Sequence, residues 1–202
     1  MIDKTLIETY LDSTYKKYQQ DIAFAYLRST AKSFVPGEGP LGAAVMLVGE
    51  APGPEEDDAG RPFVGPSGEI LNTLLKSAGL DRKAVFITNT VKYRTVNTIG
   101  NNRHPTRQEV IDSLPCLKTE VVTVNPKVLA LMGKSAIQAF FPMHKPQADH
   151  GMIYQHTPTS RPVVLLYHPG LVIYEKSMMQ TLIDDFNQIN VALREQSGGD
   201  DS

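Results

Sequence analysis

The length and charge of the chain narrow what it can be. Its 202 residues are enough to bury a full hydrophobic core, and we expect one domain over residues 1–194, followed by a flexible polar tail over residues 195–202. A hydrophobic content of 41% and a formal net charge of −2 are typical of a soluble globular protein. Any contact with nucleic acid would therefore depend on a local basic patch.

The chain has one cysteine, Cys116, which excludes an internal disulfide and an all-cysteine metal site. Its polar, amphipathic N-terminal residues do not resemble the apolar core of a signal peptide, and no apolar run has the length that a bilayer requires. We therefore expect a cytoplasmic protein that contacts no membrane and holds no metal.

The predicted elements alternate between helices and short apolar strands. Helical spacing occupies the N-terminal residues up to about Ser33. Four apolar runs rich in β-branched residues predict strands at residues 43–49, 84–88, 127–133 and 162–170. The helices between and after them are predicted at residues 67–79 with Ser67 as N-cap, after a capping box formed by Thr106 and Glu109, at 134–141 and at 175–194. This alternation predicts an α/β fold with a parallel sheet.

Polar residues directly follow three of the four predicted strands. Glu50 comes after Gly49, while Asn89 and His168 follow the second and fourth strands. Because ligands of parallel α/β sheets bind outside the carboxyl ends of the strands, we expect these side chains to converge on one rim. Phe63 adds an aromatic ring between two glycine-containing turns. Such a set suits a flat heterocycle. An aromatic ring can stack on it, an amide can hydrogen-bond to its donor and acceptor edge, and a histidine can donate a hydrogen bond to an oxygen that gains charge.

Taken singly, each of these residues also has an ordinary structural explanation. Phe63 could be a core residue, Asn89 a turn former, His168 a cap for nearby backbone, and Glu50 the N-cap of a helical turn. A nucleotide triphosphate site is excluded, because the five carboxylates of GEAPGPEEDD would repel phosphate and no Walker A motif is present. The expected convergence on one rim favours the functional interpretation.

Five motifs occur in a characteristic order along the chain, namely GEAPGPEEDDAGRPFVGPSGEIL, ITNTVKYR, GNNRHPTRQE, PKVLALMGKSAIQAF and LLYHPG. With these motifs, residues 34–193 resemble the family 4 uracil-DNA glycosylases. The resemblance implies a three-layer α/β/α fold around a four-stranded parallel sheet, in an enzyme that flips uracil out of DNA and excises it. No nucleophilic residue or lyase lysine is obvious, which argues for a monofunctional enzyme that uses water. We expect it to act as a monomer in the cytoplasm, in a bacterial or viral system, and to associate with the nucleoid through DNA.

The resemblance assigns catalytic roles to three residues. Glu50 would lie beside the sugar and position or activate the attacking water. Asn89 would hydrogen-bond the pairing edge of the base, and His168 would donate to uracil O2 as the glycosidic bond breaks. A carboxylate near an oxocarbenium-like sugar and a donor at the departing base suit this reaction.

Other residues of the base pocket follow from the same resemblance. Phe63 would stack on the flipped base, and Glu56 would lie near C5 of the base and discourage thymine. Gly49 and Ala51 would line the pocket. Asn102 corresponds to a second family asparagine, although Asn101 is an equally close match.

Contact with the DNA backbone is expected from the segment between Asn89 and Arg107, which contains no acidic residue. We expect Lys92, Arg94 and Arg103 to contact phosphates, although such charges are often merely solvated. Leu171, with the two residues after it, would fill the gap that the flipped nucleotide leaves.

The sequence departs from the family at its cofactor site. Members hold an iron–sulfur cluster on four cysteines, whose positions correspond here to Ile22, Ala25, Tyr93 and Ser113. Because none of these residues is a thiolate ligand, we predict that the cluster is absent and that Ile22, Ala25 and Tyr93 fill its space as an apolar plug.

Two alternative functions share the expected fold. The protein could excise another modified pyrimidine, or it could be a non-catalytic DNA-binding module that assists replication. The joint presence of Glu50, Phe63, Asn89 and His168 favours the excision of uracil.

Overall fold

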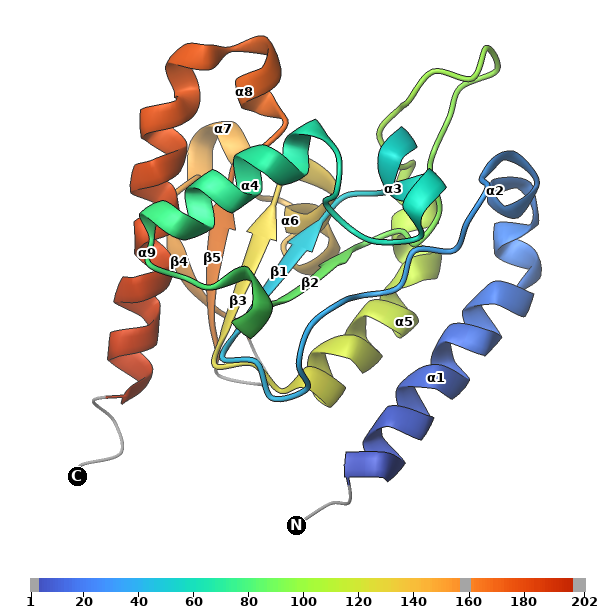
Figure 1. Ribbon diagram of the computed structural model, residues 1–202, viewed down its shortest axis with the longest axis horizontal. Helices are drawn as coiled ribbons and strands as arrows, with labels where there is room; N and C mark the ends of the chain where they lie inside the picture. Colours follow the sequence, from blue (N-terminus) through green and yellow to red (C-terminus); the bar gives the residue numbers. More distant parts are fainter. Residues whose placement is uncertain (1–3, 157–160, 198–202) are drawn as a thin grey trace.

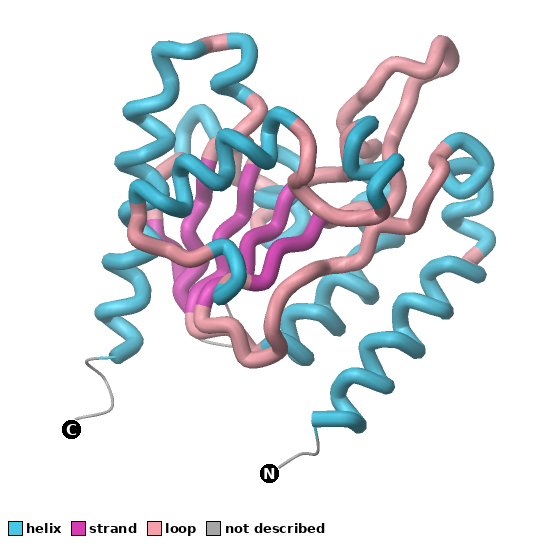
Figure 2. The backbone as a smooth tube through the Cα atoms, viewed as in Figure 1, coloured by secondary structure: helices cyan, strands magenta, loops and turns pink. Residues whose placement is uncertain are grey.

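The centre of the molecule is one five-stranded mixed sheet (Figures 1 and 2). The computed structural model describes residues 4–156 and 161–197. In spatial order the strands are β2 (Phe86–Asn89), β1 (Val45–Gly49), β3 (Val128–Met132), β5 (Arg161–Leu166) and β4 (Ile153–His156). The first four are mutually parallel, whereas β4 pairs antiparallel to β5.

The four predicted strands are confirmed, but the prediction of a purely parallel four-stranded sheet is wrong. Strand β4 has only four residues, IYQH, and lies at the edge of the sheet. An edge strand does not need the continuous apolar run that marks strands buried on both faces, so β4 carries no such signal in the sequence.

Helices cover both faces of the sheet and give the expected three layers (Figure 1). Alternate residues of each strand point to opposite faces. Leu47 of β1 belongs to the core beneath α4 (Pro66–Ser77) and α9 (Met179–Ser197), whereas its neighbour Met46 belongs to the core beneath α5 (Arg107–Val124) and α6 (Lys134–Phe140). Every residue of β1 is buried.

The N-terminal segment forms an outer helical layer. Helix α1 (Lys4–Gln20) packs against α5, and the chain continues through a 3₁₀ turn (Ile22–Phe24) into α2 (Ala25–Thr30). The remaining short elements are α3 (Pro54–Ala59), α7 (Pro146–Asp149), α8 (Leu171–Tyr174) and two further 3₁₀ turns (Arg82–Ala84 and Lys176–Met178). Within residues 4–156 and 161–197, none of the helices combines the length and the apolar character needed to cross a membrane.

The helix ends test the sequence predictions directly. The capping box is confirmed, because Glu109 N donates to Thr106 Oγ1 at 3.2 Å and Thr106 N donates to Glu109 Oε2 at 2.7 Å. Ser67 is not an N-cap: α4 begins at Pro66, with Gly65 before it, because the fixed φ of proline and its missing N–H suit the first helical position. Helix α9 continues to Ser197, beyond the expected start of the tail at residue 195, and residues 198–202 lie outside the described part.

Candidate active site

Two buried side chains meet at Gly49, the last residue of β1. A methyl group on Gly49 would lie 2.4 Å from Oδ1 of Asn89 and 2.6 Å from Cζ of Phe63. Only glycine leaves room there for the amide and the ring to approach the backbone this closely.

The other two predicted residues meet at Gly133, which follows β3. A methyl group on Gly133 would lie 2.4 Å from Oε1 of Glu50 and 3.1 Å from Cβ of His168. The rings of His168 and Phe63 are stacked, with centroids 5.7 Å apart and planes inclined by 30°. The four side chains therefore converge at the carboxyl ends of the parallel strands, although they come from four separate segments.

Phe63 is held in a backbone conformation that is uncommon for its residue type. Its φ of 53° lies in the left-handed region, which is costly for a bulky side chain and persists only where surrounding contacts impose it. Glu56 supplies those contacts: its Oε1 accepts from the backbone N–H groups of Val64 and Gly65, both at 2.9 Å, and its Oε2 accepts from Gly53 N at 3.0 Å. Both carboxylate oxygens are thus committed to the backbone, and these contacts do not support the expected role beside C5 of a base.

Asn89 contributes an unsatisfied acceptor. The residue is 2% exposed, and its Oδ1 has no hydrogen-bond partner among the described residues. A buried polar atom without a partner costs about 1–3 kcal/mol, so a bound ligand that donates an N–H to this oxygen would recover that energy. The amide therefore points to a ligand with a donor on its edge.

The hydrogen bonding of His168 fixes the position of its proton. Gly170 N donates to Nδ1 of His168 at 3.1 Å, so Nδ1 carries no proton. Burial lowers the pKa of His168, which favours the neutral ring near neutral pH. The neutral imidazole must then carry its proton on Nε2, where it can donate to a ligand oxygen.

Glu50 is buried but held in its charged form. Its Oε2 lies 2.7 Å from Nδ1 of His104 and 3.2 Å from the Ser135 hydroxyl, and its Oε1 accepts from Ser135 N at 3.3 Å. Burial raises the pKa of Glu50, but the hydrogen bond and charge of His104, with the other contacts, outweigh burial and lower the pKa below its ordinary value. The carboxylate is therefore ionised at neutral pH.

Sequence reasoning missed His104 and Ser135 as site residues. Ser135 stands two residues after the predicted strand at residues 127–133, whose carboxyl end lies at this rim, so its position carried a usable signal. His104 lies 54 positions from Glu50 along the chain, and no local spacing encodes that contact.

The expected contact between Lys92 and DNA phosphate is wrong. The Lys92 side chain is completely buried, and its Nζ donates to Glu120 Oε2 at 2.7 Å, Thr88 Oγ1 at 2.6 Å and the Asn89 carbonyl oxygen at 2.5 Å. A buried ammonium needs such partners, and all of them lie inside the fold. Lys92 instead holds the backbone of Asn89, the residue whose side-chain Oδ1 has no partner among the described residues.

Two other expected DNA contacts, Arg94 and Arg103, are partly exposed in the loop between β2 and α5. Arg94 Nε donates to Oδ1 of Asn102 at 2.7 Å, so the exposed Asn102 contacts this arginine and is not brought into contact with the four converging side chains. Arg103 forms two hydrogen bonds with Glu109, at 2.6 and 2.7 Å, which neutralise part of its charge.

Two further predicted site residues lie elsewhere. Leu171 begins α8 and is partly buried against the core, and Ala51 packs against an aromatic cluster beside α1.

That aromatic cluster occupies the region expected to correspond to the iron–sulfur site. Tyr18 stacks on Phe24 with ring centroids 3.9 Å apart, and its hydroxyl lies 2.9 Å from Oγ of Ser113. Tyr93 is buried in the same cluster. The same group contains one thiol, Cys116, and burial raises its pKa to about 12. A single buried thiol among packed aromatic rings does not fit an iron–sulfur cluster, which needs several thiolate ligands. Ile22 is 84% exposed, so it does not fill buried space in this region as expected, and the residues buried there include Tyr18, Phe24 and Tyr93.

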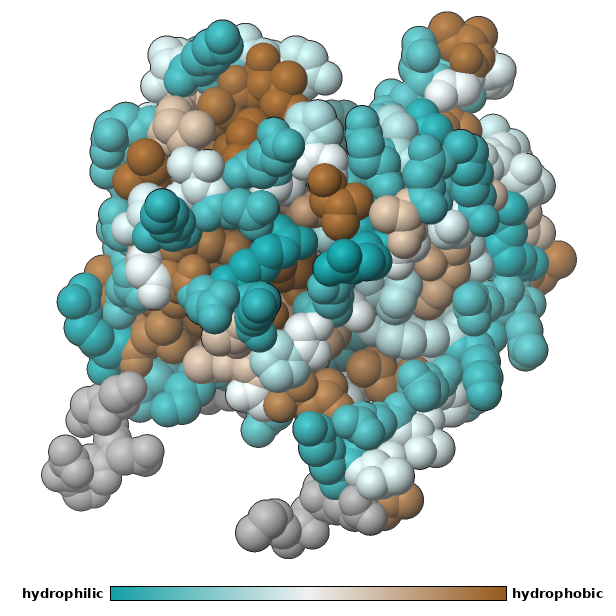
Figure 3. Space-filling view, viewed as in Figure 1, coloured by the Kyte–Doolittle hydropathy of each residue, from teal (hydrophilic) through white to brown (hydrophobic). Residues whose placement is uncertain are grey.

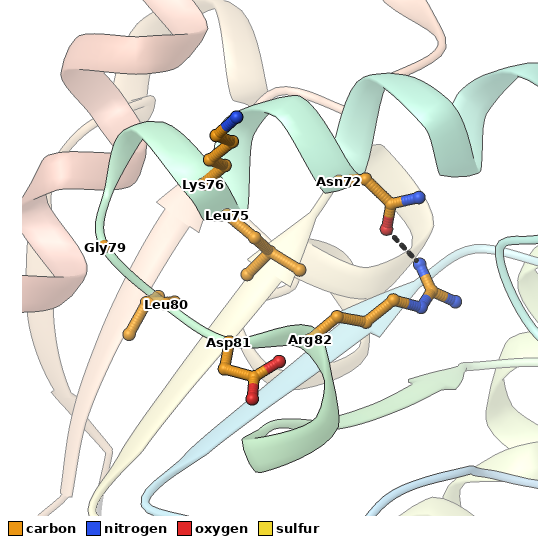
Figure 4. A pocket seen from close by; sticks show the side chains of 7 residues that line it. All are labelled: Asn72, Leu75, Lys76, Gly79, Leu80, Asp81 and Arg82. Atoms are coloured by element: carbon orange, nitrogen blue, oxygen red, sulfur yellow. Dashed lines mark hydrogen bonds between the residues drawn. The ribbon is translucent and has the colours of Figure 1, made fainter.

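A shallow hollow beside the C-terminal end of α4 lies away from this site (Figure 4). It is lined by Asn72, Lys76 and Arg82 among others, and Arg82 donates to Asn72 Oδ1 at 2.9 Å. Arg82 precedes β2, so the hollow lies toward the amino end of that strand. Ligands of parallel α/β sheets bind at the other end, which makes this hollow the weaker candidate.

Comparisons with known proteins identify the family of the chain. Residues 36–194 match the model of the uracil DNA glycosylase superfamily. The chain is 34% identical over 170 residues to a Type-4 uracil-DNA glycosylase of Archaeoglobus fulgidus, covering 81% of this chain and 83% of that protein. It is 38% identical over 159 residues to the Pyrobaculum aerophilum Type-4 uracil-DNA glycosylase, covering 75% and 79% of the two chains. A Thermotoga maritima protein of the same name is 42% identical over 106 residues, or 52% and 53% of the two chains. The chain therefore belongs to the uracil DNA glycosylase superfamily and, within it, to the Type-4 uracil-DNA glycosylases.

Proposed function

We propose that this protein is a uracil-DNA glycosylase, which hydrolyses the N-glycosidic bond of a uracil flipped out of DNA and leaves an abasic site. The observation that carries the proposal is the convergence of Glu50, Phe63, Asn89 and His168 at one rim of the sheet. Membership of the Type-4 family supports the same activity.

The pocket matches the hydrogen-bonding groups of uracil. A base lying against the ring of Phe63 can donate its N3–H to the unsatisfied Oδ1 of Asn89. Its O2 can then accept from Nε2–H of His168. Negative charge accumulates on O2 as the glycosidic bond breaks, so a donor already fixed in place stabilises the transition state more than the bound substrate.

Glu50 acts on the sugar side of the bond. As uracil leaves, C1′ gains positive charge, and the ionised Glu50 carboxylate favours that charge electrostatically. The same carboxylate can orient the attacking water and accept the proton that the water loses as its oxygen bonds to C1′, while the C1′–N1 bond breaks and uracil leaves as an anion. His104 and Ser135 keep the carboxylate in position.

We assign DNA binding to side chains near the carboxyl ends of the parallel strands, where the four converging side chains lie. We assign phosphate contacts to Arg94 and, in part, to Arg103, and we assign Leu171 at the start of α8 to the gap left by the flipped nucleotide. In this proposal the protein acts as a monomer.

An oligonucleotide with one uracil, offered single-stranded and as a duplex and then treated with alkali, tests the proposal. We expect strand cleavage with the wild-type protein, and a loss of about 10²–10³ in kcat with the His168→Ala variant at nearly unchanged KM, because His168 acts mainly on the transition state. A protein that binds both DNAs but releases no uracil from either would be a binding module. Release of other modified bases in preference to uracil would also overturn the proposal.

A further inference from the structure

The loop between β2 and α5 forms an ordered projection, which we call the hairpin arm (residues 94–104). Its two sides are joined by hydrogen bonds from Arg103 N to the Thr95 carbonyl oxygen at 3.0 Å and from Asn97 N to the Asn101 carbonyl oxygen at 2.8 Å. Thr95 Oγ1 adds a bond to the Arg103 carbonyl oxygen at 2.6 Å. The arm is therefore a defined structural element.

The tip of the arm presents an apolar side chain to solvent. Oδ1 of Asn97 accepts from Ile99 N at 3.1 Å and from Asn101 N at 2.9 Å, and Gly100 has a φ of 82°, so the turn is built from residues suited to it. Ile99 is 78% exposed. The hydrogen bonds of the turn do not involve the Ile99 side chain, which is therefore available for a contact outside the chain.

The base of the arm is fixed to the active site. His104 closes the arm and binds Oε2 of Glu50 at 2.7 Å, while its neighbour Arg103 is held by Glu109. The position of Ile99 is therefore set relative to the carboxylate that acts on the sugar.

A second apolar projection lies across the site from the arm. Helix α8 follows His168 and exposes Ile173 at 45% and Tyr174 at 90%. Figure 1 shows α8, together with the start of α9, and the yellow-green arm rising beyond the carboxyl ends of the strands on opposite sides, and Figure 3 shows apolar side chains in both places.

We propose that the hairpin arm is a second wedge for duplex DNA, in which Ile99 enters the base stack while α8 fills the gap at the flipped nucleotide. This inference rests on the proposed glycosylase function. Apolar wedges that enter base steps stabilise distorted DNA, and two wedges on either side of the site would hold the duplex open around the extruded base.

The charge of the segment favours DNA as the occupant. The sequence has no acidic residue between Asn89 and Gln108, and Arg94 is partly exposed on the arm. A protein partner that covered Ile99 would sit on the same edge as the active site and obstruct the substrate.

The test compares Ile99→Ala with a matched control, Val122→Ala. Val122 is 67% exposed on the C-terminal half of α5, away from the arm. Uracil release is measured from a duplex and from the same strand alone, and a 2-aminopurine base beside the uracil reports unstacking. For Ile99→Ala we expect kcat/KM on the duplex to fall about tenfold with a smaller fluorescence rise, whereas activity on the single strand stays unchanged, because only the duplex has a base stack to open. Val122→Ala should match the wild type in both contexts.

The inference fails if Ile99→Ala lowers activity equally on both substrates or changes neither. It also fails if binding to DNA is unaffected while Ile99→Ala abolishes association with a second protein. Failure of the glycosylase proposal itself is distinguishable, because the wild type would then release no uracil even from the single strand.

Discussion

Nδ1 of the exposed His104 lies 2.7 Å from Oε2 of the buried Glu50, so a residue of the hairpin arm is in direct contact with the candidate catalytic carboxylate. The hydrogen bond and the negative charge of Glu50 raise the pKa of His104 above its ordinary value. The same contact lowers the pKa of Glu50 against the effect of burial. The pair is therefore an ion pair at mildly acidic pH, and this has two measurable consequences.

The first consequence concerns the pH dependence of excision. His104→Ala removes the hydrogen bond that does most to lower the pKa of Glu50, so that pKa should rise. We expect the acid limb of the kcat/KM profile to move to higher pH, with a several-fold loss of activity near pH 5, which corresponds to about 1 kcal/mol for a largely exposed partner. His144→Ala is the control, since His144 also pairs with a carboxylate, Asp149, but outside the site. An unshifted acid limb in His104→Ala would contradict the prediction.

The second consequence concerns the pH dependence of stability. Glu50, with a lowered pKa, stabilises the fold above its ordinary value of 4.5, and this contribution is lost as the pH falls through the folded-state pKa. His104, with a raised pKa, stabilises the fold below its ordinary value of 6.5, and this contribution is lost as the pH rises through the folded-state pKa. The difference in unfolding free energy between the wild type and His104→Ala should therefore be largest between pH 4.5 and 6.5. Urea titrations at several pH values measure it, and a pH-independent difference would exclude the ion pair.

Gly49→Ala should close the base pocket. The added methyl group would lie within 2.6 Å of both Asn89 and Phe63, so we expect kcat/KM to fall about 100-fold or more. The free energy of unfolding should fall by only about 1–3 kcal/mol, as in other overpacked cores. Gly42→Ala is the control, because its methyl group would meet no atom within 4 Å, while the φ of 83° at Gly42 makes the substitution strained. It should lower stability and leave excision intact. Equal activities of the two variants would show that Gly49 does not border the pocket.

The buried pair of Lys92 and Glu120 should show strong energetic coupling. Both side chains are fully buried, and Tyr15 donates a further hydrogen bond to Glu120 at 2.6 Å. Lys92→Met leaves a buried carboxylate without its cation and should lower the free energy of unfolding by about 3–5 kcal/mol. The double variant with Glu120→Leu should lower it by less than the sum of the losses in the two single variants. Chemical denaturation measures the cycle. Additive losses would mean that the two charges do not stabilise each other.

The purified protein should contain no iron. From the resemblance we expect Tyr93 and Ser113 to stand where the family has cysteine ligands, and the aromatic rings of Tyr18 and Phe24 pack around them. We expect no visible charge-transfer absorbance and no iron by elemental analysis after anaerobic purification. Stoichiometric iron with such absorbance would contradict the prediction.

The sequence by itself determined the features that depend on local patterns. Apolar runs marked the four parallel strands, and the T-x-x-E spacing marked the start of α5, because burial on both faces and helix capping are encoded by neighbouring residues. The residues that would meet at the rim also followed from order alone, since every parallel strand delivers its next residue to the same edge of the sheet.

Only the tertiary structure decided the features that depend on distant partners. Lys92 and Arg94 are two residues apart in one basic segment, yet Lys92 forms a fully buried ion pair with Glu120 while Arg94 reaches the surface. Likewise Glu56 and Glu50 belong to one acidic motif, but backbone N–H groups satisfy the first and His104 binds the second. The physical reason is that burial and pairing set the role of a charged side chain, and both are properties of the packed chain and not of its local sequence.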